Sequence, residues 1–297
     1  MDYFISLTIT GLVMGIIFAL MALGLTLIFS ILNVINFAHG EFYMLGGYAI
    51  IILLDNFTNV PPLVMVFVAG ILVALIGVVF EIAFLRPMHD EKIERPAEYA
   101  VLITFGLSFF LLNLALAIWG PYPHSPPSFI EGSVQLGPIY VSADRLVASG
   151  MSLLLLAVVL LVINKTWLGK ALRAVSQDKQ AAAVVGINSD VMNTIAFAMG
   201  VGLAAISGAL LASTFSVTPD VGAVPSVRSY IIIVLGGMGS IPGSIIGALI
   251  IGLVESYGAG YFPDPSRALN YKTAYGLVIF ALVLLVRPQG LFGRKEQ

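Results

Sequence analysis

The sequence predicts an all-α polytopic membrane protein, because its composition is too apolar for a water-soluble domain and its apolar residues gather in long segments. Hydrophobic residues make up 59% of the 297 residues and charged residues 10%, against roughly 45–50% and about 25% in a soluble domain. The mean hydropathy of +1.01 has the same implication. One water-soluble core of this size could not bury so much apolar surface, so we expect lipid to be the solvent.

About eight hydrophobic segments are predicted, since a helix needs roughly 20 mostly apolar residues to cross a bilayer. Two of them are interrupted: 42–54 is short and follows the polar cluster Asn33–Glu41, and 229–256 is broken by the glycine-rich run Gly236–Gly243. We therefore expect broken or re-entrant elements near 33–55 and 229–256, inside a single membrane domain covering 1–297. The six regular segments are 5–32, 62–85, 97–119, 147–164, 191–215 and 271–287.

The distribution of Lys and Arg predicts the orientation. Ten of the 14 basic residues lie in 86–96, 165–190 and the C-terminal tail, and short connections rich in Lys and Arg stay in the cytoplasm. We expect these three regions, and the C-terminus with them, to be cytoplasmic, so that 229–256 must enter and leave the membrane on the same side. The proline-rich stretch 120–146 is then an external cap or docking surface, and the side of the N-terminus stays open.

Polar and small residues in the two interrupted segments are the candidates for a translocation path or gate. A polar group without a partner in hydrocarbon costs several kcal/mol, so such side chains should face protein or a water-filled route. The bland alternatives are a hydrated turn for the first segment and close helix packing for the glycines, and residue spacing alone does not decide between them. The candidates are Asn33, Asn36, Phe37, His39, Glu41, Gly46, Gly47, Gly236, Gly237 and Gly239. Glu81 and Glu255 are open in the same way, either as buried functional acids or as hydrated interfacial ones.

Several chemistries are disfavoured by what the sequence lacks. There is no cysteine, and the net charge of −2 argues against nucleic-acid binding. His39 and Glu41 do not have the spacing of a zinc motif, and no Lys-Ser/Thr follows Gly236–Gly243, so a nucleotide loop fails. Without a nucleophile or metal motif an intramembrane enzyme is disfavoured. An ion-coupled secondary transporter remains the alternative, while an inert scaffold fits the broken helices poorly.

The segment 165–190 predicts a short amphipathic helix on the cytoplasmic face. Leu168, Leu172 and Val175 recur at helical spacing, and the polar residues fall between them. The neutral alternative is a connector helix that rests on the membrane surface.

Four motifs, spread over most of the chain, resemble the branched-chain amino acid ABC permeases, and specifically the shorter, high-affinity leucine/isoleucine/valine type. They are NFAHGEFYMLGGY at 36–48, GKALRAV at 169–175, AVVGIN at 183–188 and VLGGMGSIPG at 234–243. In addition, Gln180, Ala181, Ala182 and Gly186 resemble the Glu-Ala-Ala-x3-Gly loop by which ABC importer permeases dock onto their ATPases, with Gln in place of Glu.

The resemblance implies a permease subunit in a bacterial inner membrane. Its partners would be a second homologous permease, two cytoplasmic ATPase subunits, which bind ATP and Mg²⁺, and a periplasmic substrate-binding protein. This chain itself would bind no cofactor and would be no enzyme. The coupling loop would comprise Arg173, Asp178, Gln180, Ala181, Ala182 and Gly186. Branched-chain amino acids are the expected substrate, with urea, short amides or other amino acids as alternatives within the same architecture.

Overall fold

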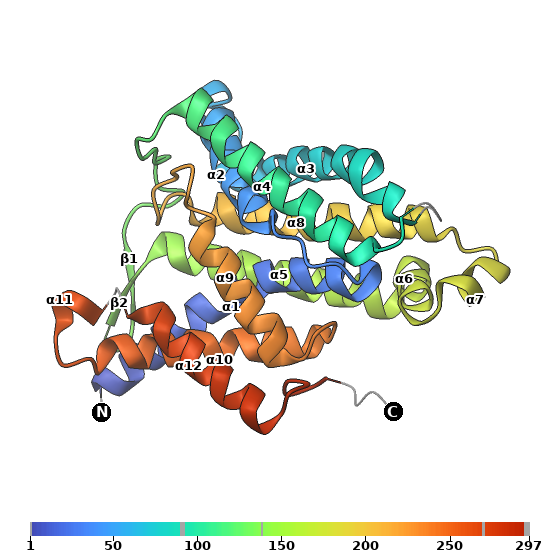
Figure 1. Cartoon of the computed structure of the whole chain (residues 1–297). Coiled ribbons are helices and arrows are strands. Elements are labelled where there is room, and N and C mark those ends of the chain that lie inside the picture. Colours follow the sequence, from blue (N-terminus) through green and yellow to red (C-terminus); the bar gives the residue numbers. More distant parts are fainter. Residues whose placement is uncertain (1, 90–92, 138, 269–270, 294–297) are drawn as a thin grey trace.

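The computed structural model describes residues 2–89, 93–137, 139–268 and 271–293. Its long helices run alongside one another, and their connections gather at two opposite ends of the bundle (Figure 1). The strands are β1 (Ser133–Leu136) and β2 (Ile139–Ser142). The helices are α1 (Asp2–Leu32), α2 (His39–Asn56), α3 (Pro62–Phe80), α4 (Pro96–Trp119), α5 (Ala143–Lys165), α6 (Trp167–Gln177), α7 (Lys179–Val184), α8 (Ser189–Leu211), α9 (Ala223–Gly236), α10 (Ile241–Gly260), α11 (Pro265–Ala268) and α12 (Lys272–Val286).

This architecture confirms the predicted all-α polytopic membrane fold. Among the described residues, six helical segments are long and apolar enough to cross a membrane: Asp2–Leu32, Pro62–Met88, Pro96–Trp119, Ala143–Lys165, Ser189–Leu211 and Ile241–Gly260. The third span, α4, buries few of its side chains within the chain, and most of them face outward, as expected of a helix surrounded by lipid. Two shorter helices, α9 and α12, are also apolar.

α1 is the central helix and packs against α10, α8 and α5. Small residues allow these close contacts, because two helix backbones approach most closely where no side chain separates them. A Cβ atom on Gly11 would lie 3.0 Å from the carbonyl oxygen of Gly252, and one on Gly15 would lie 3.1 Å from that of Ala248. The hydroxyl groups of Thr26 and Ser244 add a hydrogen bond of 2.5 Å between α1 and α10.

The two ends of the bundle differ. One end, called here the α6/α7 end, carries α6, α7, the α3–α4 connection and the end of α12 (Figure 1). The other, the hairpin end, carries β1, β2, α11 and the N-terminus (Figure 1), and there Tyr3 donates a hydrogen bond of 2.6 Å to the carbonyl oxygen of Gly260. The described parts of 86–96, of 165–190 and of the chain after α12 therefore share the α6/α7 end.

Both predicted irregular elements are present. After α1 the chain turns at Asn33, which has a φ of 58°, and folds back toward the middle of the bundle, where α2 begins at His39 (Figure 1). The second break joins α9 to α10 through Gly237 and Gly239, whose φ angles of 100° and 82° favour glycine. α9 and α10 form a pair of helices that begins near the end of the bundle with the β-hairpin and returns toward that same end (Figure 1). The charge distribution predicts this path for 229–256.

Sequence reasoning found no regular structure in 120–146, but the structure has a β-hairpin there. β1 and β2 pair antiparallel from Ser133 opposite Ser142 to Leu136 opposite Ile139. The loop is tied to the α8–α9 connection, where the backbone amides and carbonyls of His124 and Val217 exchange hydrogen bonds of 2.9 and 2.7 Å. The strands are only four residues long, which is too short for a periodic pattern to be read from sequence.

Candidate functional site

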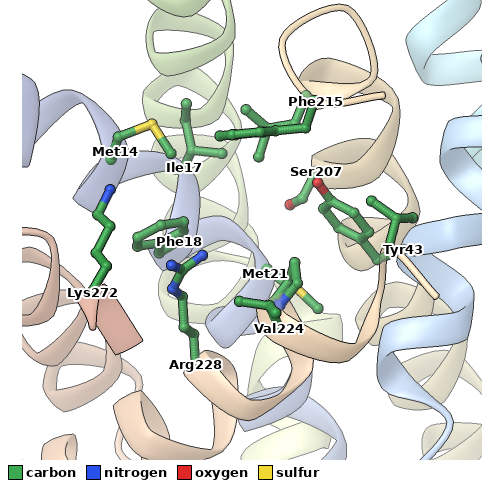
Figure 2. A pocket seen from close by; sticks show the side chains of 13 residues that line it. Met14, Ile17, Phe18, Met21, Tyr43, Ser207, Phe215, Val224, Arg228 and Lys272 are labelled. Carbon is green, nitrogen blue, oxygen red and sulfur yellow. The ribbon is translucent and has the colours of Figure 1, made fainter. Parts of the chain in front are cut away.

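A cavity of about 360 Å³ lies among α1, α2, α8, α9 and α12, in the half of the bundle nearer the hairpin end. Its walls are mostly apolar and include Ile17, Phe18 and Met21 of α1 (Figure 2). At its rim, Phe215 of the α8–α9 connection and Val224 of α9 are 44% and 48% exposed. A concave, largely apolar site with a few polar groups is the usual form of a small-molecule site.

Two cations, Arg228 and Lys272, line this apolar cavity. Arg228 donates a hydrogen bond from Nε to Oε1 of Glu255 at 2.7 Å, while Lys272 Nζ lies 4.0 Å from Oε2 of the same carboxylate. The guanidinium of Arg228 also lies 4.9 Å from the ring centroid of Phe18, within range of a cation–π interaction. Glu255 is completely buried, so of the two interpretations left open by its sequence position, the buried one holds.

Two hydroxyl groups complete the polar lining. Tyr43 of α2 and Ser207 of α8 come together on the side of the cavity away from Lys272 (Figure 2). The Ser207 hydroxyl donates to the carbonyl oxygen of Leu203 at 2.9 Å, one turn earlier in α8, while the Tyr43 hydroxyl has no hydrogen-bond partner among the described residues. Both hydroxyls can therefore accept a hydrogen bond from a ligand.

The polar residues predicted in 33–48 do not line this cavity, although two of them, Asn36 and His39, contact the helices around it. Asn36 and His39 are fully buried, and His39 Nε2 lies 3.1 Å from the carbonyl oxygen of Met21, one of the lining residues. Tyr230 donates a hydrogen bond of 2.8 Å to the carbonyl oxygen of Asn36. These contacts tie the start of α2 to α1 and α9.

Phe37 and Glu41 link the same region to α4. Phe37 packs edge-to-face on Phe105, with ring centroids 6.2 Å apart, and Glu41 accepts a hydrogen bond of 2.7 Å from Ser108. Glu41 is partly exposed. Its partner Ser108, like Phe105, belongs to α4, a helix that buries little of its surface, so these two contacts attach α4 to the start of α2.

Most of the glycines predicted for the path make close backbone contacts. Gly46 faces the backbone of Ala205 in α8, and Gly47 faces the side chain of Val217. Gly236 faces Gly243 across the α9–α10 hairpin, and Gly237 faces the chain after α12. There the amides of Leu291 and Phe292 donate hydrogen bonds to the last two carbonyl oxygens of α9. Any added side chain at these positions would push the two backbones apart.

Asn33 and Gly239 line a second, larger cavity of about 720 Å³ beside α6. Arg173 of α6 lines it as well, and its guanidinium donates a hydrogen bond of 2.5 Å to the carbonyl oxygen of Ile163 at the end of α5. This cavity brings one residue predicted for the coupling loop together with two residues predicted for the path.

The predicted amphipathic helix in 165–190 is present as α6, with Leu172 and Val175 buried and Leu168 partly buried. A second short helix, α7, contains Gln180, Ala181 and Ala182 and is capped by Asp178, whose carboxylate accepts hydrogen bonds from the amides of Gln180 and Ala181 at 2.8 and 3.0 Å. Burial lowers the pKa of Lys179 at its start, and the nearby Asp190 opposes that shift.

α7 projects from the bundle (Figure 1) and ends in an exposed apolar tip. Val184 and Val185 are 87% and 73% exposed, and Gly186 follows with a φ of 83°. Ala182, by contrast, is buried against the rest of the loop. Exposed apolar side chains in an otherwise polar loop are typical of an interaction surface.

Glu81 is also buried, in a π-helical turn (Glu81–Leu85) at the end of α3. Thr194 of α8 donates a hydrogen bond of 2.6 Å to its Oε2, and Arg86 donates one of 3.1 Å to the same threonine hydroxyl. The interfacial, hydrated interpretation of Glu81 therefore does not hold.

Sequence reasoning missed Arg228, Lys272 and Tyr43 as site residues. Once the three regions rich in Lys and Arg are taken as cytoplasmic, the charge rule puts the remaining basic residues, these two cations among them, on the outer side. The available signal was that a basic residue inside an apolar segment has a functional or paired role, and the partner, Glu255, is 27 residues from Arg228 and visible only in the folded chain.

Comparisons with a family model and with known proteins point to the same family. The model of the branched-chain amino acid transport system permease component matches residues 7–287. The high-affinity branched-chain amino acid transport system permease protein BraD of Pseudomonas aeruginosa is 34% identical, with 99% of this chain and 97% of that protein covered. LivH of Escherichia coli K12, which carries the same description, is 31% identical over 99% and 97%.

Two more distant relatives extend the comparison. The permease protein LivM of the same Escherichia coli system is 24% identical, with 93% of this chain and 67% of LivM covered. Among solved structures, PsaBC from Streptococcus pneumoniae in complex with Fab shares the fold with a TM-score of 0.51 and 11% identity, over 94% of this chain and 91% of that chain.

Proposed function

The chain belongs to the family of branched-chain amino acid transport system permease components, and from this premise we propose that it forms one half of the translocation path of an ABC importer for branched-chain amino acids. The path would pass the apolar cavity between α1, α8 and α9. The observation that carries the proposal is this cavity, because its apolar walls suit aliphatic side chains while its few charged groups suit the ends of an amino acid.

The partners follow from what this chain contains and lacks. No nucleotide-binding motif occurs in the sequence, so ATP and Mg²⁺ would be bound, and ATP hydrolysed, on two separate ATPase subunits. The similarity to LivM supports a second, homologous permease as the other half of the path. A soluble binding protein would deliver the substrate, and this chain would bind no cofactor of its own.

The orientation is supported by the clustering of basic connections at the α6/α7 end. Chains keep such connections in the cytoplasm, so this end and the C-terminus would face the cytoplasm of a bacterial inner membrane. The hairpin end, with 120–146 and the N-terminus, would face the periplasm and receive the binding protein. The sequence left the side of the N-terminus open; the start of α1 lies at the same end as the β-hairpin (Figure 1), which supports a periplasmic N-terminus.

Coupling to ATP hydrolysis would run through α6, α7 and the loop after α7. Val184 and Val185 stay largely exposed within the chain, so their apolar side chains would be buried instead in a cleft of the ATPase. Asp178 and Gly186 would shape the loop by capping α7 and by adopting a positive φ. Movement of the ATPases would then tilt α6 and alternate the access of the path.

The coupling assignment is tested by Val184→Glu in the transporter assembled with its ATPases and second permease. Since Val184 is 87% exposed, the charge should leave the fold intact and weaken ATPase binding, seen as loss of co-purified ATPase and of ATP-driven leucine uptake. Val134→Glu, at a 46% exposed position in β1 at the opposite end, is the matched control and should retain the ATPase. Full ATPase retention and uptake by Val184→Glu would refute the assignment.

A further inference from the structure

The cation pair Arg228 and Lys272 is left only partly neutralised by its buried acid. The two positive charges share one carboxylate, Glu255, and only Arg228 is within hydrogen-bond distance of it, at 2.7 Å. Lys272 Nζ stands 4.0 Å away and makes no hydrogen bond to any residue that the structure describes. Arg145 of α5 adds a further positive charge that repels Lys272.

Arg228 has donors to spare as well. Its Nε is used by Glu255, while the two terminal NH₂ groups donate to no atom of the described residues. Its guanidinium is held in place by the Glu255 contact on one side and by Phe18 on the other. A fixed guanidinium with free terminal donors is well suited to bind a carboxylate.

The surroundings make an anion favourable at this point. The two side chains are 15% and 24% exposed and face a cavity whose remaining lining is almost entirely apolar, with Phe18 next to Arg228 and Phe215 on the opposite wall (Figure 2). An uncompensated positive charge in an apolar site is costly, and a bound negative charge removes that cost. The volume of about 360 Å³ is at the small end of the range of ligand sites.

We propose that this cavity is a transient binding site on the path for a small carboxylate with an apolar side chain. The carboxylate of the passing amino acid would be bound by Lys272 and by the terminal NH₂ groups of Arg228, with its side chain against Phe18, Met21 and Phe215. The inference rests on the proposed function for the identity of the ligand. It assigns to the permease itself a requirement for the carboxylate, in addition to any selection made by a binding protein.

Glu255 has a positioning role in this arrangement. Its carboxylate is too deeply buried to line the cavity, and it fixes Arg228 by the 2.7 Å hydrogen bond. Because Glu255 already offsets part of the positive charge, the site is expected to bind a carboxylate more weakly than two unneutralised cations would, and so to release it. Weak binding suits a route on which each site must be left as readily as it is entered.

The test uses the complete membrane complex in nanodiscs without binding protein, with saturation-transfer NMR to detect weak ligands. Leucine is compared with leucinamide, which keeps the side chain and ammonium and lacks the carboxylate. We expect a signal for leucine and none for leucinamide. Lys272→Gln should weaken leucine binding about tenfold, the effect of losing one charge-assisted hydrogen bond, and Lys272→Arg should restore it.

Arg267→Gln is the matched control, because Arg267 is a cation at the same end of the molecule with a 70% exposed side chain outside the cavity. It should bind leucine like the unaltered complex. Equal signals from leucine and leucinamide, or unchanged leucine binding in Lys272→Gln, would overturn the proposal. So would dissociation of the two permeases in Lys272→Gln, because Lys272 would then be pairing with the partner chain.

The same samples separate this inference from the function on which it rests. ATP-driven uptake of leucine by the unaltered complex with its binding protein tests the importer assignment alone, and its absence would refute that assignment. Uptake together with indifference to the carboxylate in the NMR comparison would leave the importer assignment standing and refute only the carboxylate site.

Discussion

Arg228→Met provides a sharp test of the charge arrangement at the centre of the site. Methionine fills much of the space of the arginine stem and removes its charge, so Glu255 would stay buried with Lys272, 4.0 Å away, as its nearest positive charge. Removing one partner of a buried ion pair costs about 3–5 kcal/mol. Since Lys272 still compensates part of the charge, we expect the lower end, about 3 kcal/mol of unfolding free energy.

The double variant Arg228→Met/Glu255→Gln is expected to recover most of that loss, because the fully buried carboxylate is then gone and the remaining charge, on Lys272, is 24% exposed and borders the cavity. Glu255→Gln alone should cost less than Arg228→Met, since Arg228 borders the cavity and remains open to hydration. The measurement is equilibrium unfolding of the purified chain in mixed micelles by titration with SDS, analysed as a double-mutant cycle.

The matched control is Arg95→Met, which breaks the ion pair of Arg95 with Glu98, a pair whose side chains are 74% and 70% exposed. An exposed pair contributes little to stability, so this variant should unfold almost like the unaltered chain. Equal destabilisation by Arg228→Met and Arg95→Met, or no recovery in the double variant, would refute the view that Glu255 depends on Arg228.

Three further predictions concern the scaffold and the coupling loop. Thr194→Val should destabilise the chain by about 1–3 kcal/mol in the same SDS titration, because the buried carboxylate of Glu81 loses its 2.6 Å hydrogen bond. Gly46→Val should prevent α2 from packing on α8 and abolish a folded, monodisperse protein on size-exclusion chromatography, whereas Gly106→Val, where a Cβ meets nothing within 4 Å, should behave normally. Asp178→Ala should cost α7 about 1 kcal/mol by removing its cap, seen as faster hydrogen exchange at the amides of 180–184.

Most of the fold could be predicted from the hydropathy and glycine patterns of the sequence, because a lipid solvent requires long apolar helices. A span must be apolar throughout, which is why the polar cluster Asn33–Glu41 and the glycine-rich run Gly236–Gly243 marked the two irregular elements in advance. The β-hairpin in 133–142 was not predictable, since four-residue strands have no periodicity to detect.

None of the residues predicted for the path lines the apolar cavity, and sequence reasoning missed the polar residues that do. Sequence reasoning left Glu255 open between a buried functional acid and a hydrated interfacial one, because its partner Arg228 lies in another helix and the pair forms only when α9 folds back along α10. His39, singled out for its polarity, is instead buried beside the carbonyl of Met21. The sequence shows which ionisable residues lie in apolar segments and would be unfavourable in lipid. Only the tertiary contacts show which neighbouring residue pairs with each of them.

The arrangement of α9 suggests how the two ends of the molecule communicate. α9 carries Arg228 near its middle, and its C-terminal end is held by the turn at Gly237 and Gly239. That turn and Arg173 of α6 line the same cavity, so a tilt of α6 reaches the end of α9 directly. A shift of α9 would move Arg228 relative to Lys272 in α12, and the carboxylate bound between them would be released by the same motion that opens the path.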